Sequence, residues 1–287
     1  AGQRLDKYLQ KTLNTAPRGL IYKLLRKKRI KINGKRAGGN EILCPGDVLT
    51  LYLAEDTLAG LAERREVPPA PQQFTVVYED EGLLALDKPA GMLIHPSTHL
   101  IEGTLANFTA GYYRRTGQKC AFHPVTRLDR DTFGVVLLAK NSYLHEAMNA
   151  LHRQGQLEKC YHARVFGGPP SDSGTVDAPI ARKPLPSLLR EVRADGKPCR
   201  TEYRVLERDG ETALLALRPV TGRTHQLRIH CAWLGCPILG DPQYGTPASM
   251  AYSLARGLTG QRLCAVSLTF PHPLTGEKVC IRSNLTP

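Results

Sequence analysis

The stretch RLDRDTFGVVLLAKN, residues 127–141, places four charged side chains directly before a continuous apolar run. These side chains are Arg127, Asp129, Arg130 and Asp131. The run Val135–Leu138 is typical of a strand that is buried on both faces. A carboxylate in such a position can act as a nucleophile or a base, and a nearby arginine can keep it ionised. An isolated pattern of this kind is more often a surface loop with ordinary ion pairs. Other motifs in the chain must therefore decide between a catalytic loop and a surface loop.

Other polar side chains that could do chemistry each have a structural alternative. Tyr161 falls in an expected strand, where a tyrosine is more often a core or edge residue. Arg223 and Arg228 can simply bind phosphate. His225 and His230 more often satisfy backbone groups than catalyse. The residue types alone therefore do not separate catalysis from packing.

The sequence offers no motif for a metal or a nucleotide cofactor. The eight cysteines include no CxxC pair, and His95 and His99 are separated by Pro96 without an HExxH pattern. The phosphate-binding patterns GxGxxG and GxxxxGK[ST] are also absent. We therefore expect no metal and no cofactor. No apolar run approaches the roughly 20 residues of a membrane span, and the first residues are no signal peptide, so we expect a cytoplasmic protein without a membrane partner.

The positive charge is concentrated at the start of the chain. Residues 1–36 contain twelve Lys and Arg against a single acid, Asp6, which gives +11 of the chain's net charge of +13. The remaining 251 residues therefore contribute only +2. A small positive head on a nearly neutral body indicates a dedicated module for a polyanion, although a solvated basic face without a partner remains the alternative.

The head has a readable order of elements. Leu5, Tyr8 and Leu9 form the apolar stripe of a short helix, and a second helix after Pro17 has Ile21, Leu24 and Leu25 on one face. Residues 30–32 alternate as a strand, Asn33-Gly34 is a hairpin turn, and a further strand is expected at 47–53. The second helix and the following KINGK resemble the S-four-type RNA-binding domain. That resemblance implies RNA-binding residues, which we assign to Arg4, Lys23, Arg26, Lys27, Arg29, Lys31 and Lys35.

Residues 54–73 lack strong periodicity and end in a proline-rich run, so we expect a linker. From residue 74 the pattern changes to alternating strands and turns. We expect a hairpin from 76–78 and 83–86 and a helix at 141–153. Later strands are expected at 161–166, 201–206, 213–219, 225–230 and 265–270. Many strands and few helices predict an α+β domain with a mainly antiparallel sheet over 74–287, beside a small α/β head over 1–53.

Residues 74–287 resemble the RluA-type family of pseudouridine synthases of ribosomal and transfer RNA. The segment 127–141 is similar to the family signature HRLDxxTSG, which is followed by an apolar strand and AK. Five more blocks follow the family pattern in order: EDEGLLALDKPAGMLIHP (79–96), EKCYHARVFG (158–167), TGRTHQLRIH (221–230), GCPILGDPQYG (235–245) and FPHPLTGE (270–277). Basic head domains of the type described above are frequent in the same family.

The resemblance implies roles for individual residues. Asp129 corresponds to the family's catalytic aspartate, Tyr161 to its active-site tyrosine, and Arg228 to its arginine, with Arg223 as a second candidate. Arg127, Lys88 and His95 are expected to contact the substrate. The carboxylate would either attack the ribose C1′ or remove the 2′ proton to form a glycal, and an ionised aspartate in a dry site suits both routes.

Three residues depart from the family pattern. Thr126 replaces the usual histidine before Arg-Leu-Asp, Phe133 replaces the usual serine before glycine, and Cys264 replaces a common histidine. None removes the carboxylate, the tyrosine or the arginine.

We therefore predict an RNA pseudouridine synthase that acts without a cofactor, with ribosomal RNA favoured over transfer RNA as its partner and a monomer expected. A non-catalytic RNA-binding or ribosome-assembly factor on the same fold is the first alternative. An RNA methyltransferase with the same head is the second, and it would need a glycine-rich turn that is not found.

Overall fold

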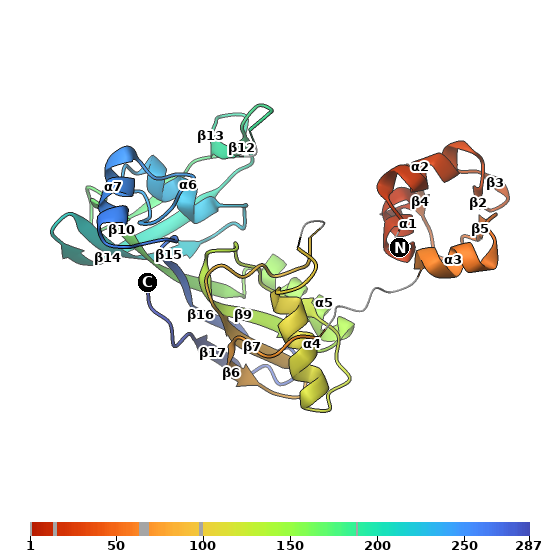
Figure 1. Cartoon of the computed structure of the whole chain (residues 1–287), viewed down its shortest axis with the longest axis horizontal. Helices are drawn as coiled ribbons and strands as arrows, with labels where there is room; N and C mark the ends of the chain where they lie inside the picture. The colour runs from red at the N-terminus through yellow and green to blue at the C-terminus, as the bar shows by residue number, and fades with distance from the viewer. Residues whose placement is uncertain (1, 14–15, 63–68, 98–99, 188) are drawn as a thin grey trace. The chain divides into compact units, whose positions relative to one another are not determined.

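The computed structural model describes residues 2–13, 16–62, 69–97, 100–187 and 189–287. The chain divides into two compact units, Ala1–Glu66 and Val67–Pro287 (Figure 1). Over these described ranges, no helix combines the length and the apolar character that a membrane crossing requires.

The first unit is a small α/β head. Its elements are β1 (Gln3–Arg4), α1 (Leu5–Thr12), α2 (Arg18–Arg26), β2 (Ile30–Ile32), β3 (Lys35–Arg36), β4 (Ile42–Leu43), β5 (Leu49–Leu51) and α3 (Glu55–Ala62). The two predicted helices and the Asn33-Gly34 turn are confirmed, since both turn residues have positive φ and β2 pairs with β3. Leu5, Leu9, Ile21 and Leu25 form the core with Ile30, as the helical spacing predicted.

The predicted linker at 54–73 is wrong in its first part, because helix α3 lies there. Leu58 and Leu61 of α3 pack against the apolar core of the head. Residues 63–68 lie outside the described residues, and from Pro69 the chain belongs to the second unit, where Ala70 N–H donates to the Asn107 carbonyl. A short helix with two leucines gives a weak periodic signal, which is why the sequence pattern missed it.

The second unit is built on one large mixed sheet. Its elements are β6 (Thr75–Glu79), β7 (Leu83–Lys88), α4 (Leu105–Arg115), β8 (His123–Pro124), β9 (Phe133–Ala139), α5 (Ser142–Arg153), β10 (Glu158–Phe166), β11 (Ser173–Asp177), β12 (Ile180–Arg182), β13 (Arg190–Val192), β14 (Arg200–Asp209), β15 (Thr212–Pro219), α6 (Gln226–Trp233), α7 (Pro247–Ala255), β16 (Leu263–Pro271) and β17 (Lys278–Arg282). The main strand order is β11-β14-β15-β10-β16-β9-β7-β6, and every neighbouring pair except β16 with β9 is antiparallel. The α+β class with a mainly antiparallel sheet is therefore confirmed.

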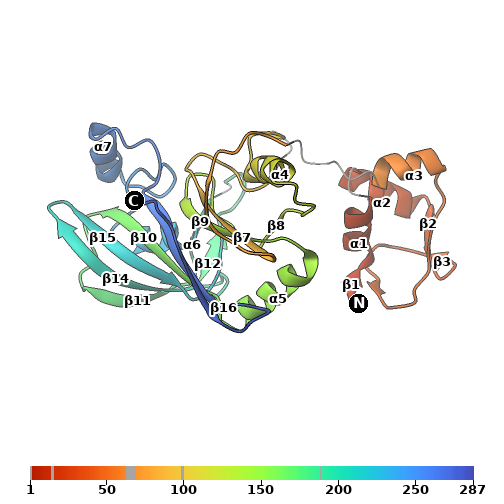
Figure 2. The ribbon, with the colours of Figure 1, turned by 90° about the horizontal axis from the view of Figure 1, so that it is seen from below.

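Strands β7 and β9 are buried on both faces, as the continuous apolar run predicted. Val135 and Leu137 pack with Leu144 of α5, whereas Val136 and Leu138 pack with Leu105 of α4. Because successive side chains of a strand point to opposite faces, α4 and α5 cover opposite sides of this half of the sheet. Figures 1 and 2 show α6 and α7 beside the other half, formed by β10, β14 and β15.

The predicted strand at 225–230 is wrong, because these residues begin helix α6. The sequence alternates polar and apolar residues there, which imitates a strand with one wet face. In the structure, however, the polar members Gln226, Arg228 and His230 are all buried and hydrogen-bonded. The polar and the apolar side chains of residues 226–230 are thus all buried, so their alternation does not indicate an element with one exposed and one buried face.

Gly134, at the start of β9, permits the parallel contact between the two halves of the sheet. Its φ is +105°, and a Cβ there would lie 2.4 Å from the Ala265 carbonyl oxygen on β16. A side chain therefore needs both an unfavourable backbone conformation and a displacement of β16.

We predict that Gly134→Ala lowers the free energy of unfolding by about 3 kcal/mol, since strain and clash act together. Urea unfolding followed by fluorescence of Trp233, the single tryptophan, reports on this unit alone. Gly260→Ala is the matched control, because its added Cβ meets nothing within 4 Å. Equal unfolding midpoints for the two variants would contradict this account of the sheet.

Candidate active site

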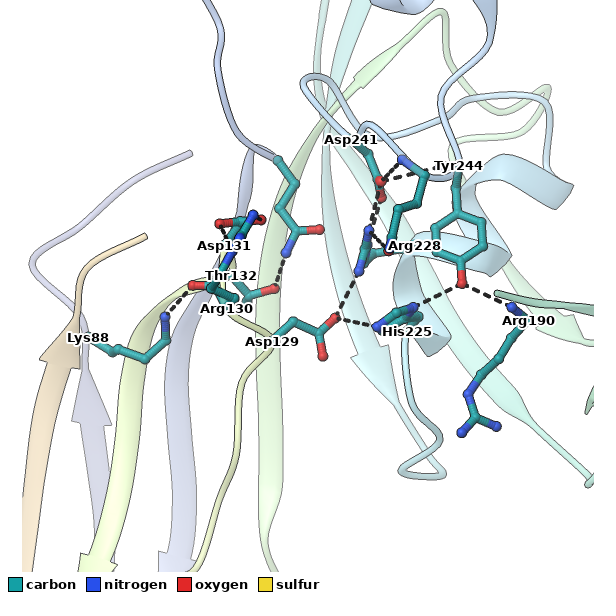
Figure 3. A network of polar contacts seen from close by, with 12 residues as sticks. Lys88, Asp129, Arg130, Asp131, Thr132, Arg190, His225, Arg228, Asp241 and Tyr244 are labelled. Carbon is teal, nitrogen blue, oxygen red and sulfur yellow. Dashed lines mark hydrogen bonds and ion pairs between the residues drawn. The ribbon is translucent and has the colours of Figure 1, made fainter. Parts of the chain in front are cut away.

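The side chains of Asp129 and Arg228 contact each other where the loop before β9 faces helix α6 (Figure 3). Asp129 lies in the loop between β8 and β9, and the Arg228 guanidinium Nη1 is 3.3 Å from its Oδ2. The Asp129 side chain is 31% exposed, whereas that of Arg228 is 7% exposed. The site is thus a reachable carboxylate against a buried cation, and it is wetter in the free protein than the dry site that we expected.

Arg228 is held in place by a buried carboxylate, Asp241. The guanidinium Nε and Nη2 donate to the two Asp241 oxygens at 2.7 and 2.8 Å, and Nη2 also donates to Gln243 at 2.7 Å. Burial by itself lowers the pKa of Arg228, but the hydrogen bonds and charge of Asp241, followed by Asp129, outweigh it and raise the pKa. A bidentate pair fixes the plane of the guanidinium, which leaves Nη1 directed at Asp129.

His225 faces the same carboxylate oxygen of Asp129 as Arg228 does. Its Nε2 is 3.8 Å from Asp129 Oδ2, and its Nδ1 is 2.9 Å from the Tyr244 hydroxyl. That hydroxyl accepts the backbone N–H of Arg190, so it can donate its own proton to Nδ1. Neutral His225 then has its proton on Nε2, facing Asp129 (Figure 3).

His225 occupies an unusual backbone position. Its φ is 58°, in the left-handed region, directly before the first turn of α6. Such a conformation is uncommon for a residue other than glycine and is concentrated at functional sites. Burial lowers the pKa of His225, Asp129 and Asp241 oppose this, and Arg228 and Arg190 add to the lowering.

Lys88 holds the Asp129 loop in place through the carbonyl of Arg130. It is fully buried, and its Nζ donates to the carbonyls of Pro89, Met92 and Arg130 at 2.8, 2.9 and 2.8 Å. Burial lowers the pKa of Lys88 to about 7, against the charges of Asp131 and Asp129. Lys88 Nζ thus links the backbone of Arg130, the neighbour of Asp129, to the end of β7, and the expected substrate contact by Lys88 stays a prediction.

The three residues that depart from the family pattern each have a defined structural contact. Thr126 Oγ1 accepts the Leu137 N–H at 2.9 Å, so the threonine retains one hydrogen bond behind the loop. Phe133 and Cys264 are direct partners in the β9–β16 register, which means that these two departures occur at one contact. The loop is further held by Gln261, whose amide donates to Thr132 Oγ1 at 2.6 Å.

The structure separates the remaining candidates. Tyr161 on β10 is half-buried, and burial, followed by the charge of Asp129, raises the pKa of its hydroxyl. Arg223 donates to the Pro198 carbonyl at 3.2 Å, whereas Arg228 is the arginine that contacts the carboxylate. His95 packs edge-to-face against Phe122, and Arg127 is exposed.

The expected RNA-binding cations of the head differ in their surroundings. Arg4 donates to the buried Asp6 at 3.1 and 3.0 Å, so it has a structural partner. Lys31 is half-buried, with its Nζ 5.1 Å from the centre of the Tyr52 ring. The other five cations are exposed: Lys23, Arg26, Lys27, Arg29 and Lys35.

Sequence reasoning missed Asp241, Gln243 and Tyr244. All three lie in GCPILGDPQYG, a block that was noticed as a pattern without a role for its polar residues. An aspartate after glycine reads as a turn residue, and nothing in a single sequence says that it is 1% exposed beneath an arginine. Across the described residues, no group of three or more His, Cys, Asp or Glu is arranged to hold a metal ion.

Two protein-family models match parts of the chain. The family model described as RNA pseudouridylate synthase matches residues 82–233, and the S4 domain model matches residues 3–49. Ribosomal large subunit pseudouridine synthase C of Vibrio cholerae is 33% identical, with 99% of this chain and 90% of that protein covered. The protein of the same name from Salmonella typhimurium is 36% identical, with 99% and 89% covered.

Solved structures show the same fold. Human RNA pseudouridylate synthase domain containing 4 is 26% identical with a TM-score of 0.60, over 74% of this chain and 88% of that one. The human domain containing 1 protein is 22% identical with a TM-score of 0.61, over 77% and 92%.

Removing the charge of Asp241 leaves Arg228 buried without its main partner. We predict that Asp241→Asn lowers the free energy of unfolding by about 3 kcal/mol, as for other broken buried ion pairs. Asp195→Asn is the control, since the Asp195 side chain is 70% exposed and pairs with an exposed arginine, so its loss costs about 0.5 kcal/mol or less. Urea unfolding of both variants measures the difference, and similar values for the two would refute the structural role of Asp241.

Proposed function

Because the chain belongs to the RNA pseudouridylate synthase family, we propose that it isomerises particular uridines of large-subunit ribosomal RNA, with Asp129 as the essential carboxylate. The observation that supports this most strongly is the Asp129–Arg228 pair, because it joins a reachable carboxylate to a buried, fixed cation. We assign Tyr161 to the same site, because the charge of Asp129 contributes to the raised pKa of its hydroxyl.

The choice of RNA is supported from two directions. Relatives that match nearly the whole chain are named as ribosomal large subunit pseudouridine synthases. The head matches an S4 domain, and its exposed cations can neutralise phosphates with the release of counterions. Transfer RNA remains the second substrate class.

The proposed reaction is balanced without an added reagent. The glycosidic bond between C1′ and N1 breaks, a bond between C1′ and C5 forms, and the proton of C5 leaves while N1 gains one. Asp129 either attacks C1′ and holds the sugar covalently or removes the 2′ proton, and both routes need an ionised carboxylate. Arg228 Nη1 supplies a charge-assisted contact to that carboxylate from a position that Asp241 fixes.

Tyr161 is proposed to contact the uracil ring. Its raised pKa keeps the hydroxyl protonated at neutral pH, so it relays the C5 proton by accepting it while it passes its own proton on, and it does not act as a phenolate base. The exposed part of Asp129 is open to a ribose, but a nucleotide that is stacked within a helix does not present its glycosidic bond and its base to a side chain outside the helix. The target nucleotide is therefore extruded, at a cost of a few kcal/mol.

The alternative is a non-catalytic RNA-binding or assembly factor on the same fold. Such a factor would not need an arginine held by two buried hydrogen bonds so that its free nitrogen faces a reachable carboxylate. Incubation with ribosomal RNA followed by nucleoside chromatography distinguishes the two, since only an enzyme yields pseudouridine.

We expect Asp129→Asn to abolish conversion while leaving RNA affinity nearly unchanged, because the amide cannot act as nucleophile or base. Primer extension after carbodiimide labelling maps the product, and filter binding measures affinity. Asp172→Asn, whose side chain is 84% exposed and pairs with Arg208, serves as the control and should convert RNA normally. Full conversion by Asp129→Asn would show that another residue is the essential carboxylate.

Activity should also fall in acid through His225. Its lowered pKa means that it is neutral at pH 7 and becomes charged only below the ordinary histidine value of about 6.5. The cation would then pair with Asp129, and kcat/KM should fall by about tenfold per pH unit on that limb.

His225→Gln retains a polar group beside Tyr244 and Asp129 but cannot titrate, so its acid limb should lie at lower pH. His162→Gln, one residue beyond Tyr161 and on the opposite face of β10, should keep the wild-type limb. A profile of kcat/KM between pH 5 and 8 that is the same for all three proteins would exclude His225 from the acid response.

A further inference from the structure

A group of basic side chains gathers at Lys159 of strand β10. Lys159 is two residues before Tyr161, so it points to the same face of the strand at a spacing of about 7 Å. The register shift near this point does not alter that alternation. Cys160 pairs with Ser267 and Tyr161 with Ala265, so the extra residue is Val266 on β16.

Lys159 contacts a histidine of α5 and lies within the electrostatic influence of Arg127. Its Nζ is 3.0 Å from His152 Nε2 on α5. Burial, followed by the positive charge of Arg127, lowers the pKa of Lys159 to about 8. Burial and the charge of Lys159 in turn lower the pKa of His152. Arg127 belongs to the loop of Asp129, two residues before the carboxylate, so strand, helix and loop each contribute one base.

This group lacks the paired carboxylates that Arg228 and Arg130 possess. Arg228 is paired with Asp241, and Arg130 with Asp131. Among the described residues, no carboxylate lies within 4 Å of a charged nitrogen of Lys159 or Arg127. His152 and Arg127 are exposed and Lys159 is half-buried, so an anion can reach all three.

Lys159 and Arg127, two cations without a carboxylate partner, are stabilised by a bound anion, which also restores the proton affinity that burial and repulsion lower. A lysine and an arginine together supply several N–H donors, which suit the oxygens of a phosphate. The anion that must pass beside Asp129 and Tyr161 is the backbone of the substrate.

We propose that Lys159, His152 and Arg127 bind a phosphodiester of the substrate RNA next to the extruded uridine. This inference rests on the proposed function, because it takes the ribose at Asp129 as its reference point. The contact fixes the RNA backbone on one side of the nucleotide while the base turns, so Lys159 acts in positioning the RNA and does not touch the reacting atoms.

Salt dependence of RNA binding tests the contact without turnover. The probe is a fluorescein-labelled RNA hairpin with uridines in its loop, titrated with the full chain between about 50 and 200 mM NaCl. Lys159→Gln should weaken binding by about three- to tenfold and reduce the slope of log K against log salt by about 0.7, the value for one phosphate of a single strand. Lys159→Arg should restore both, and Lys278→Gln, an exposed lysine on β17, should change neither.

Single neutral methylphosphonate linkages, placed one at a time in a hairpin that the wild type converts, locate the phosphate. A linkage beside the converted uridine should weaken wild-type binding as much as Lys159→Gln does, with no further loss in that variant. The proposal would be overturned if every linkage lowered the RNA affinity of the wild type and of Lys159→Gln equally. It would also be overturned if no linkage lowered the RNA affinity of the wild type. The result for the wild type alone remains decisive even if Lys159→Gln folds poorly.

Two further outcomes would point to a different ligand or a different activity. Competition by inorganic phosphate at constant ionic strength, combined with indifference to methylphosphonates, would assign the group to a free anion and overturn the RNA contact. Failure of the wild type to convert any uridine rejects the proposed function instead, and the salt slope of Lys159→Gln still decides whether the group binds RNA.

Discussion

The site depends on the buried pair of Arg228 and Asp241. A guanidinium that is 7% exposed is stable only with a partner, and Asp241 occupies two of its donor positions in a fixed plane. The third position, Nη1, is therefore directed at Asp129 from across the domain. Because Asp241 and Arg228 are fixed by the fold, only Asp129 has to be brought to them, and the Asp129 loop is the element that the remaining contacts secure.

Those contacts come from both halves of the sheet. Lys88 ties the loop to the end of β7, Gln261 holds Thr132 from the segment before β16, and the β9–β16 pairing joins the strands behind them. The close approach of Gly134 to Ala265 is part of the same β9–β16 pairing. A rigid frame of this kind lets a loop residue that is one-third exposed keep a defined position while remaining accessible to a ribose.

Much of the fold could be predicted where one physical signal dominated. The Asn33-Gly34 turn, the helical stripes of the head and the doubly buried strand at 135–138 each follow from local chemistry. The resemblance to a known family brought Asp129 and Arg228 together although 99 residues separate them. The prediction failed where burial reversed the usual meaning of a residue. Gln226, Arg228 and His230 gave the alternation of a strand although all three are buried in a helix. Nothing in the sequence indicated that Lys88 is buried with three carbonyl partners.

The most direct test is a double-mutant cycle between Arg228 and Asp241, read as the single-turnover rate of uridine conversion by Arg228→Lys, Asp241→Asn and the double variant. If Asp241 acts on catalysis only by holding Arg228, the double variant should be no slower than the slower single variant, with a coupling energy of about 2–3 kcal/mol. Rate losses that simply add would contradict the account, because Arg228 would then serve Asp129 without the support of Asp241.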